Sequence, residues 1–177
     1  GISLPLFVLT TFLVPLAIVS AWTPVDSRQS QFYGLMLFME ANLLGVFAAL
    51  DFFLWFVFWE AVLVPMYFLI GIWGGPRRKY AAIKFFVYTN AASLLMFIGF
   101  MSLVFALGDS VSSFALPEIA QAVAAGGLDT WFGIPPDQIA MIAFLAMFLG
   151  FAVKVPIVPF HTWLPDAHVE APTPVSV

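Results

Sequence analysis

Long runs without a charged side chain constrain this sequence more than any other feature. No charged residue lies between Gly1 and Val25, and none lies between Phe85 and Gly108. A helix of about 20 predominantly apolar residues is long enough to cross a bilayer. These runs therefore predict helices that span a membrane.

The composition excludes the soluble classes of protein. Charged residues make up 9% and apolar residues 63% of the chain, whereas soluble domains contain about 25% and about 45–50% of them. So few charges cannot cover a water-facing surface when 21 phenylalanines and 6 tryptophans also need burial. A soluble enzyme, a nucleic-acid-binding protein and a disordered chain are excluded together.

The pattern predicts an all-α fold, a polytopic transmembrane helix bundle in which residues 1–177 are part of one transmembrane domain. We expect spans at about residues 2–22, 32–50, 52–73, 80–107 and 139–160, and the start of a further helix near 172–177.

Prolines are expected to break two of these spans, because proline lacks the backbone donor of a helical residue. In the third span, Pro65 removes the hydrogen bond to the carbonyl of Ala61, next to Glu60. In the fifth span, Pro156 and Pro159 follow Lys154 closely and leave the carbonyls of Ala152 and Val155 without their helical partners.

The loop charges predict an orientation in the membrane. The loops after the first and third spans contain four basic residues, whereas the loop at 109–138 contains four acidic residues and no lysine or arginine. Because basic loops tend to remain in the cytoplasm, the loop at 109–138 is expected to face outward. A short surface helix is expected within it, at 117–125, with Trp131 and Phe132 at the membrane interface.

Two ionisable residues stand out inside the apolar spans. Glu60 lies nine residues after the turn at Asp51, about 13 Å along the helix axis, and Lys154 follows sixteen uncharged residues. Burying such a group costs about 2.5–3.5 kcal/mol and indicates a function by default. We predict that both residues handle protons. The alternatives are a static ion pair for Glu60 and an extended Lys154 side chain that reaches the interface.

Four further residues are weaker candidates for proton translocation. Glu40 lies inside the second span, and Lys84 lies near the start of the fourth, where its side chain also reaches the interface. His161 and His168 follow the proline break, and histidine titrates near the working pH. For each of them a purely structural role is the competing interpretation.

The residue inventory argues against a redox or metal centre in this chain. Cysteine is absent and only two histidines occur, so disulfides, thiolate-bound iron–sulfur clusters and multi-histidine metal sites are not expected. We therefore expect neither a metal nor a cofactor to be bound by this chain.

Two segments resemble chain M of the NADH–quinone oxidoreductases, the bacterial counterpart of complex I subunit 4. The first is Phe56–Gly75, and the second runs from Phe151 through the sequence His161-Thr162-Trp163-Leu164-Pro165-Asp166-Ala167-His168 to Thr173. Related antiporter subunits share a similar WLPDA segment, so the first motif is more specific. The resemblance also includes 84–89 and extends over the whole chain.

The resemblance implies an antiporter-like, fourteen-helix subunit of the complex I membrane arm. The family's glutamate on its fifth helix falls on Glu60, the lysine of its broken seventh helix on Lys154, and the following histidine on His161, while Lys84 joins a polar axis. The five spans would be the third to seventh helices, and the chain would be a fragment of the subunit.

Such a subunit belongs to an enzyme, a proton-translocating NADH:quinone oxidoreductase, without redox chemistry of its own. NADH, flavin mononucleotide (FMN), iron–sulfur clusters and quinone are expected in other subunits. The implied partners are neighbouring antiporter-like subunits and the lipid bilayer, in a bacterial inner membrane or its mitochondrial or thylakoid equivalent.

The mechanism that we expect is a coupled pair of charges. If Glu60 and Lys154 are close, their titrations belong to the pair, and at 4 Å with an effective dielectric constant of about 20 they interact by about 4 kcal/mol. Two alternatives are a subunit of a multi-subunit cation/proton antiporter and a non-transporting membrane scaffold.

Overall fold

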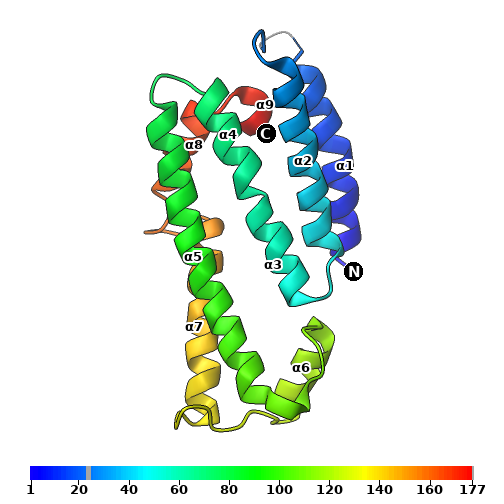
Figure 1. The fold of residues 1–177 in the computed structure, drawn as a ribbon, viewed down its shortest axis with the longest axis vertical. Coiled ribbons are helices and arrows are strands. Elements are labelled where there is room, and N and C mark those ends of the chain that lie inside the picture. Colours follow the sequence, from blue (N-terminus) through cyan, green and yellow to red (C-terminus); the bar gives the residue numbers. More distant parts are fainter. Residues whose placement is uncertain (23–24, 177) are drawn as a thin grey trace.

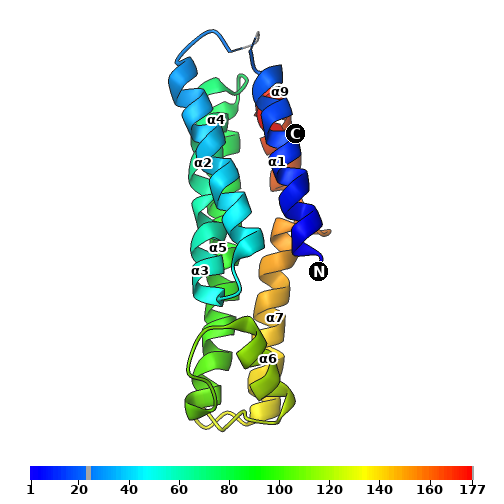
Figure 2. The ribbon, with the colours of Figure 1, turned by 90° about the vertical axis from the view of Figure 1, so that its right-hand side faces the viewer.

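The computed structural model describes residues 1–22 and 25–176. They form an elongated bundle of antiparallel helices, shown from two sides in Figures 1 and 2. The helices are α1 (Ser3–Ser20), α2 (Gln29–Ala48), α3 (Phe52–Ala61), α4 (Leu63–Trp73), α5 (Arg78–Leu107), α6 (Leu116–Ala124), α7 (Pro136–Lys154), α8 (Trp163–Glu170) and α9 (Thr173–Ser176), with a 3-10 turn at Gly108–Ser110. Thr23 and Pro24 of the first predicted loop, and Val177 of the last predicted helix, lie outside the described residues.

Within the described residues, 1–22 and 25–176, five helical segments are long and apolar enough to cross a membrane. They are Ser3–Ser20, Gln29–Ala48, Phe52–Trp73, Arg78–Ser110 and Pro136–Lys154. Large apolar side chains are exposed along them, for example Phe12 at 63% and Ile98 at 64%, as expected where lipid rather than water surrounds a helix. The predicted fold class, an all-α polytopic bundle, is confirmed.

The third span is broken beside Glu60, as its sequence predicts. Helix α3 ends at Ala61 and α4 begins at Leu63. The flanking backbone hydrogen bonds are long, at 3.3 Å from the Val62 N–H to the Phe58 carbonyl and 3.4 Å from the Met66 N–H to the Val62 carbonyl. The missing donor of Pro65 accounts for this loosening.

The fifth span ends earlier than expected, at Lys154 instead of near residue 160. Pro156 stops the helix, but the carbonyl of Ala152 does find a donor, because the N–H of Ile157 binds it at 2.8 Å. The indole N–H of Trp163 donates to the carbonyl of Val153 at 2.8 Å. The break is therefore closed by residues that follow it in the chain.

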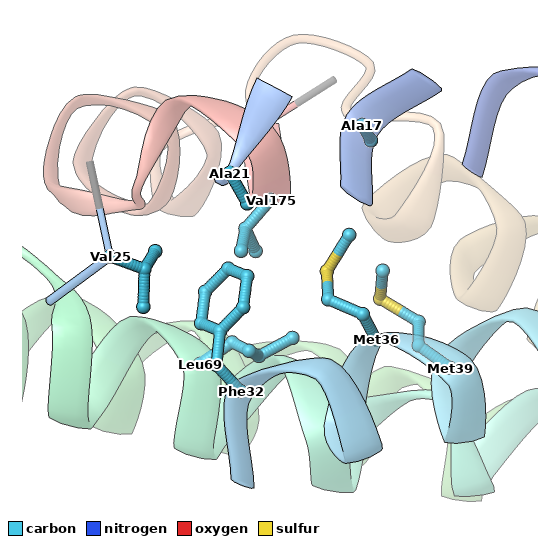
Figure 3. Packing of buried hydrophobic residues seen from close by; sticks show 8 residues of the cluster. All are labelled: Ala17, Ala21, Val25, Phe32, Met36, Met39, Leu69 and Val175. Atoms are coloured by element: carbon cyan, nitrogen blue, oxygen red, sulfur yellow. The ribbon is translucent and has the colours of Figure 1, made fainter. Parts of the chain in front are cut away.

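The last helices of the chain dock onto the first ones. One buried cluster contains Ala17 of α1, Phe32 and Met36 of α2, Leu69 of α4 and Val175 of α9. Figure 3 shows Phe32 pointing toward Val175 across this cluster. Segments from both ends of the sequence therefore share one core.

The loop that contains α6 lies at the opposite end of the bundle from the α4–α5 turn (Figure 1). Two backbone hydrogen bonds attach it to the α2–α3 turn, from the Phe52 N–H to the Phe114 carbonyl at 2.8 Å and from the Leu116 N–H to the Leu50 carbonyl at 2.9 Å. Asp51 caps α3 by accepting from the Leu54 N–H at 2.9 Å. That the loop faces outward remains a prediction.

Glycines bring α5 and α7 into close contact. A Cβ atom at Gly99 of α5 would lie 2.6 Å from the Cβ of Ala146, and one at Gly150 of α7 would lie 2.5 Å from the Cβ of Met96. Small residues at helix crossings let backbones approach inside a membrane, where packing drives association. This contact sets the position of α7, and hence of Lys154 at its end.

Replacing Gly99 with valine is expected to separate α5 from α7. The added side chain overlaps Ala146, and such overpacking costs about 1–3 kcal/mol. We expect a lower midpoint of thermal unfolding and less assembled protein in the membrane. Gly34→Val is the matched control, because a Cβ at Gly34 has no atom within 4 Å; equal effects of the two substitutions would contradict the packing argument.

Candidate functional site

The carboxylate of Glu60 projects from the end of α3, next to the helix break. Its Oε2 accepts a hydrogen bond from the amide nitrogen Nδ2 of Asn90 on α5 at 2.8 Å. Its Oε1 is buried and has no hydrogen-bond partner among the residues that the structure describes. One oxygen is therefore fixed by the protein, and the other is available to a proton.

Lys154 is the last residue of α7, at the second helix break. Its Nζ is buried without a hydrogen-bond partner and lies 4.8 Å from the centroid of the Trp59 ring. No ion pair within 4.0 Å joins Lys154 to the Glu60 carboxylate. The direct contact at 4 Å on which the expected interaction energy was based is therefore not formed.

Three of the predicted site residues have a buried polar atom that lacks a hydrogen-bond partner among the described residues. Within residues 1–22 and 25–176, the buried side-chain atoms that lack a partner are Oε1 of Glu60, Nζ of Lys154 and Nδ1 of His161. An isolated polar atom in an apolar environment is costly, so each such atom in a folded protein requires an explanation. The three residues are among those singled out from the sequence as proton carriers.

Lys84 takes part in an ion pair that sequence reasoning did not find. Its Nζ lies 2.7 Å from Oδ2 of Asp166 on α8, and Nη2 of Arg77 lies 3.7 Å from Oδ1 of the same carboxylate. No role was assigned to Asp166 from the sequence. Lys84 and Asp166 are 82 positions apart, so no local pattern could have paired them.

Glu170 is the second residue that the sequence did not reveal. Its side chain is only 6% exposed and accepts the backbone N–H of Arg77 at 2.8 Å. Its own carbonyl accepts the N–H of Gly75 at 2.9 Å, and a Cβ at Gly75 would lie 2.7 Å from Oε2 of Glu170. The glycine at position 75 is a local signal of this close contact.

Two predicted site residues lie outside this arrangement. Glu40, on α2, makes no side-chain hydrogen bond or ion pair with any residue that the structure describes. His168 is exposed on α8, where its Nδ1 lies 2.7 Å from the hydroxyl of Ser176. The structure does not bring either residue into contact with Glu60 or Lys154.

The Asp166 carboxylate is held in its charged form by its neighbours. The hydrogen bond from Lys84 lowers the pKa of Asp166 below 3.8, burial opposes this effect, and the charges of Lys84 and Arg77 add to it. A carboxylate whose pKa is depressed on folding stabilises the fold above its unfolded pKa, and this stabilisation is lost as the pH falls through the folded value.

Asp166→Asn is expected to remove this pH-dependent stability. The wild-type protein should lose stability between pH 3.8 and the lower folded pKa of Asp166, whereas the variant should be less stable at neutral pH and vary less over that window. Thermal unfolding measured from pH 7 downward tests this. Parallel curves for the two proteins would mean that Asp166 gains nothing from Lys84.

A metal centre is not apparent in the described part of the chain, which contains no group of three or more histidine, aspartate or glutamate side chains placed to hold an ion. The sequence also lacks cysteine, so thiolate ligation of an iron–sulfur cluster is excluded for this chain. The site is made of an acid, a base and a histidine.

The long apolar helices define a multi-pass membrane protein. Two of its helices are broken near prolines, and each break lies beside a buried ionisable side chain, Glu60 or Lys154. The family model described as "NADH:quinone oxidoreductase/Mrp antiporter, TM" matches residues 49–177. The chain belongs to this family, and the resemblance found in its two motifs is confirmed.

Relatives and solved structures agree with this assignment. NAD(P)H-quinone oxidoreductase chain 4 3 of Trichormus variabilis is 45% identical over 177 residues, covering 100% of this chain and 30% of the relative. NADH-quinone oxidoreductase subunit M of Rhodobacter capsulatus is 44% identical, and F(420)H(2) dehydrogenase subunit M of Methanosarcina mazei is 41% identical; each match covers all of this chain and 34% of the relative.

Among solved structures, respiratory complex I from Thermus thermophilus with bound NADH matches with a TM-score of 0.73 and 31% identity, over 98% of this chain and 32% of that one. An archaeal membrane-bound sulfane sulfur reductase matches with the same TM-score at 22% identity, which shows the fold alone. The chain thus spans about a third of the length of the relatives that it matches.

Proposed function

We propose that the chain is part of a proton-translocating membrane subunit of an NADH:quinone oxidoreductase. The observation that carries the proposal is the pair of orphaned buried atoms, Oε1 of Glu60 and Nζ of Lys154, at two helix breaks that meet, since Nζ lies 4.8 Å from the ring centroid of Trp59, the residue before Glu60. A buried acid and base that act on each other's charge bind protons as a coupled pair.

In this proposal Glu60 and Lys154 exchange a proton as their separation changes. Bringing the two charges together stabilises both, and separating them favours a neutral carboxyl and a neutral amine. The helix breaks supply the freedom to move, since irregular backbone at membrane depth is tolerated where protein or a water-filled cavity covers it. His161, whose Nδ1 is buried and unpartnered, relays the proton beyond Lys154.

The remaining candidates have supporting roles in the proposal. Lys84, held by Asp166 at 2.7 Å, contributes a fixed positive charge near the start of α5. Glu40 and His168 are proposed only as outer members of a proton path whose other residues lie in the rest of the subunit.

The enzyme in this proposal is the whole translocase, a complex I of a respiratory or related electron-transport chain. Electrons pass from NADH through FMN and iron–sulfur clusters to quinone in other subunits, and neighbouring antiporter-like subunits adjoin this one. Residues 1–177 form part of one transmembrane domain in a bacterial inner membrane or its mitochondrial or thylakoid equivalent. The basic loops face the cytoplasm and the loop at 109–138 faces outward.

A cation/proton antiporter is the second candidate, because the matching family includes Mrp antiporters. It predicts sodium-dependent transport without an associated dehydrogenase. A non-transporting scaffold predicts that substitutions at Glu60 leave pumping unchanged.

Glu60→Gln in the intact complex tests the proposal. Glutamine keeps an oxygen that accepts from Asn90, but it neither takes up nor releases a proton at physiological pH. We expect quinone-coupled proton pumping to be lost and NADH:quinone turnover to fall by a factor of about ten or more, equivalent to at least about 1.4 kcal/mol.

The control for this experiment is Asp109→Asn, which removes a carboxylate from an exposed loop position. Unchanged pumping and turnover in Glu60→Gln would show that Glu60 does not carry the proton.

A further inference from the structure

The ring of Trp59 lies against the Lys154 ammonium. Nζ lies 4.8 Å from the ring centroid, while no hydrogen-bond acceptor reaches this buried nitrogen. Tryptophan binds cations over its face more strongly than the other aromatic residues, and the attraction increases when water is absent. The ring face therefore stabilises the positive charge of the ammonium in place of a hydrogen-bond acceptor.

Contacts with three residues fix the orientation of this ring. Trp59 stacks on Trp55 with centroids 4.7 Å apart and meets the ring of Phe151 at 5.9 Å with an interplanar angle of 78°. Its Nε1 donates to the hydroxyl of Ser93 at 3.2 Å. Because Phe151 lies one turn before Lys154 on α7, the ring contacts the same end of the helix that carries the ammonium.

Helix α5 holds both members of the Trp59-Glu60 pair. Asn90 binds the Glu60 carboxylate at 2.8 Å, and Ser93, which is 1% exposed, accepts from Trp59. Residues three apart in a helix lie on one face, so Asn90 and Ser93 form a single polar edge. This edge fixes the carboxylate and the ring relative to each other.

We infer that Trp59 is a resting site for the Lys154 ammonium, alternative to the Glu60 carboxylate, and that Asn90 and Ser93 are positioning residues that hold the two sites apart. Lys154 lies on the ring in one state and moves to the carboxylate in the other. The inference rests on the proposed function, since it assigns the two positions between which the coupled pair opens and closes.

This two-position arrangement explains why Lys154 and Glu60, both among the described residues, do not form a direct ion pair. A lysine with one strong partner would remain there, whereas two partners of comparable strength allow both states to be populated. Removing the ring leaves Lys154 with Glu60 alone and locks the pair in its closed form. Removing only the indole N–H keeps the ring but loses its anchor to Ser93.

Trp59→Leu and Trp59→Phe in the intact complex test the inference. Leucine removes the ring face, so we expect coupled turnover to fall by a factor of about 5 to 30, the range that corresponds to a buried cation–π contact. Phenylalanine keeps a ring, so its loss should be clearly smaller. The control is Phe56→Leu. Phe56 lies on α3, like Trp59, but its ring packs on Phe97 of α5 with centroids 4.5 Å apart.

The hydrogen bond from Trp59 to Ser93 is tested by introducing Ser93→Ala into the wild-type protein and into the Trp59→Phe variant. In the wild-type background it should lower coupled turnover, because the ring loses its acceptor. In the Trp59→Phe background it should have no further effect, because phenylalanine has no N–H to donate. A merely structural serine would give the same loss in both backgrounds.

Equal turnover in Trp59→Leu and Phe56→Leu would overturn the inference, while loss of pumping in Glu60→Gln would still support the proposed function. An experimental structure of the wild-type complex gives an answer that does not depend on how the variants fold. Lys154 resolved on the Trp59 ring in one state supports the inference, and Lys154 bound directly to Glu60 in every state contradicts it.

Discussion

Replacing Lys154 with methionine is expected to abolish quinone-coupled proton pumping without destabilising the protein. The substitution removes the positive charge that the proposed function pairs with Glu60, so the acid loses the partner that controls its proton. We expect turnover to fall by a factor of about ten or more. Because the ammonium is buried with no acceptor among the described residues and methionine has a similar shape and no polar group, the thermal midpoint should stay the same or rise.

This combination of lost activity and unchanged or increased stability is the diagnostic result. Proteoliposomes that contain the intact complex allow turnover and pumping to be measured on the same sample, and a melting curve gives the stability. Lys79→Met, at an exposed position near the start of α5, is the control and should leave all three unchanged. A variant at Lys154 that pumps normally, or one that unfolds, contradicts the role assigned to this lysine.

Glu170→Leu is expected to release α8 from the α4–α5 turn. The carboxylate is 6% exposed and accepts the N–H of Arg77, so leucine leaves that donor unsatisfied. A hydrogen bond to a charged group contributes about 1.5–3 kcal/mol, and we expect a loss of stability of this size. Helix α8 also carries Asp166, so the Lys84 ion pair should weaken at the same time.

Limited proteolysis of the loop at 155–162, together with the thermal midpoint, measures this release. Glu170→Gln is the matched variant, because its amide oxygen still accepts from Arg77 and the loss should be about half or less. Equal destabilisation by leucine and glutamine would assign the effect to the charge instead of to the hydrogen bond from Arg77.

The fold followed from the sequence because its determinants are local. A run of about 20 apolar residues is long enough to span a membrane wherever it occurs, and a proline removes a backbone donor from its own helix without help from other segments. The break at Val62 was predicted from Pro65 for this reason. The end of α7 was misplaced because Trp163, ten residues after Val153, completes the break.

The candidate site was predicted only in part, for the same physical reason. Glu60 and Lys154 are conspicuous because burying a charge in lipid is costly at any position. Asn90 and Trp59 are ordinary residues whose roles depend on the contact between α3, α5 and α7, which the glycines at 99 and 150 set. The roles of Asp166 and Glu170 depend on long-range ion pairs with Lys84 and Arg77, which no local sequence pattern predicts.

The most direct test of the coupled pair is the NADH:quinone turnover of the intact complex in Glu60→Gln, Lys154→Met and the double variant. If the two residues form one unit, the double variant should turn over no more slowly than the slower single variant, because either substitution already disables the pair. The account predicts this strongly non-additive result. Losses that multiply in the double variant would show that Glu60 and Lys154 act independently and would contradict it.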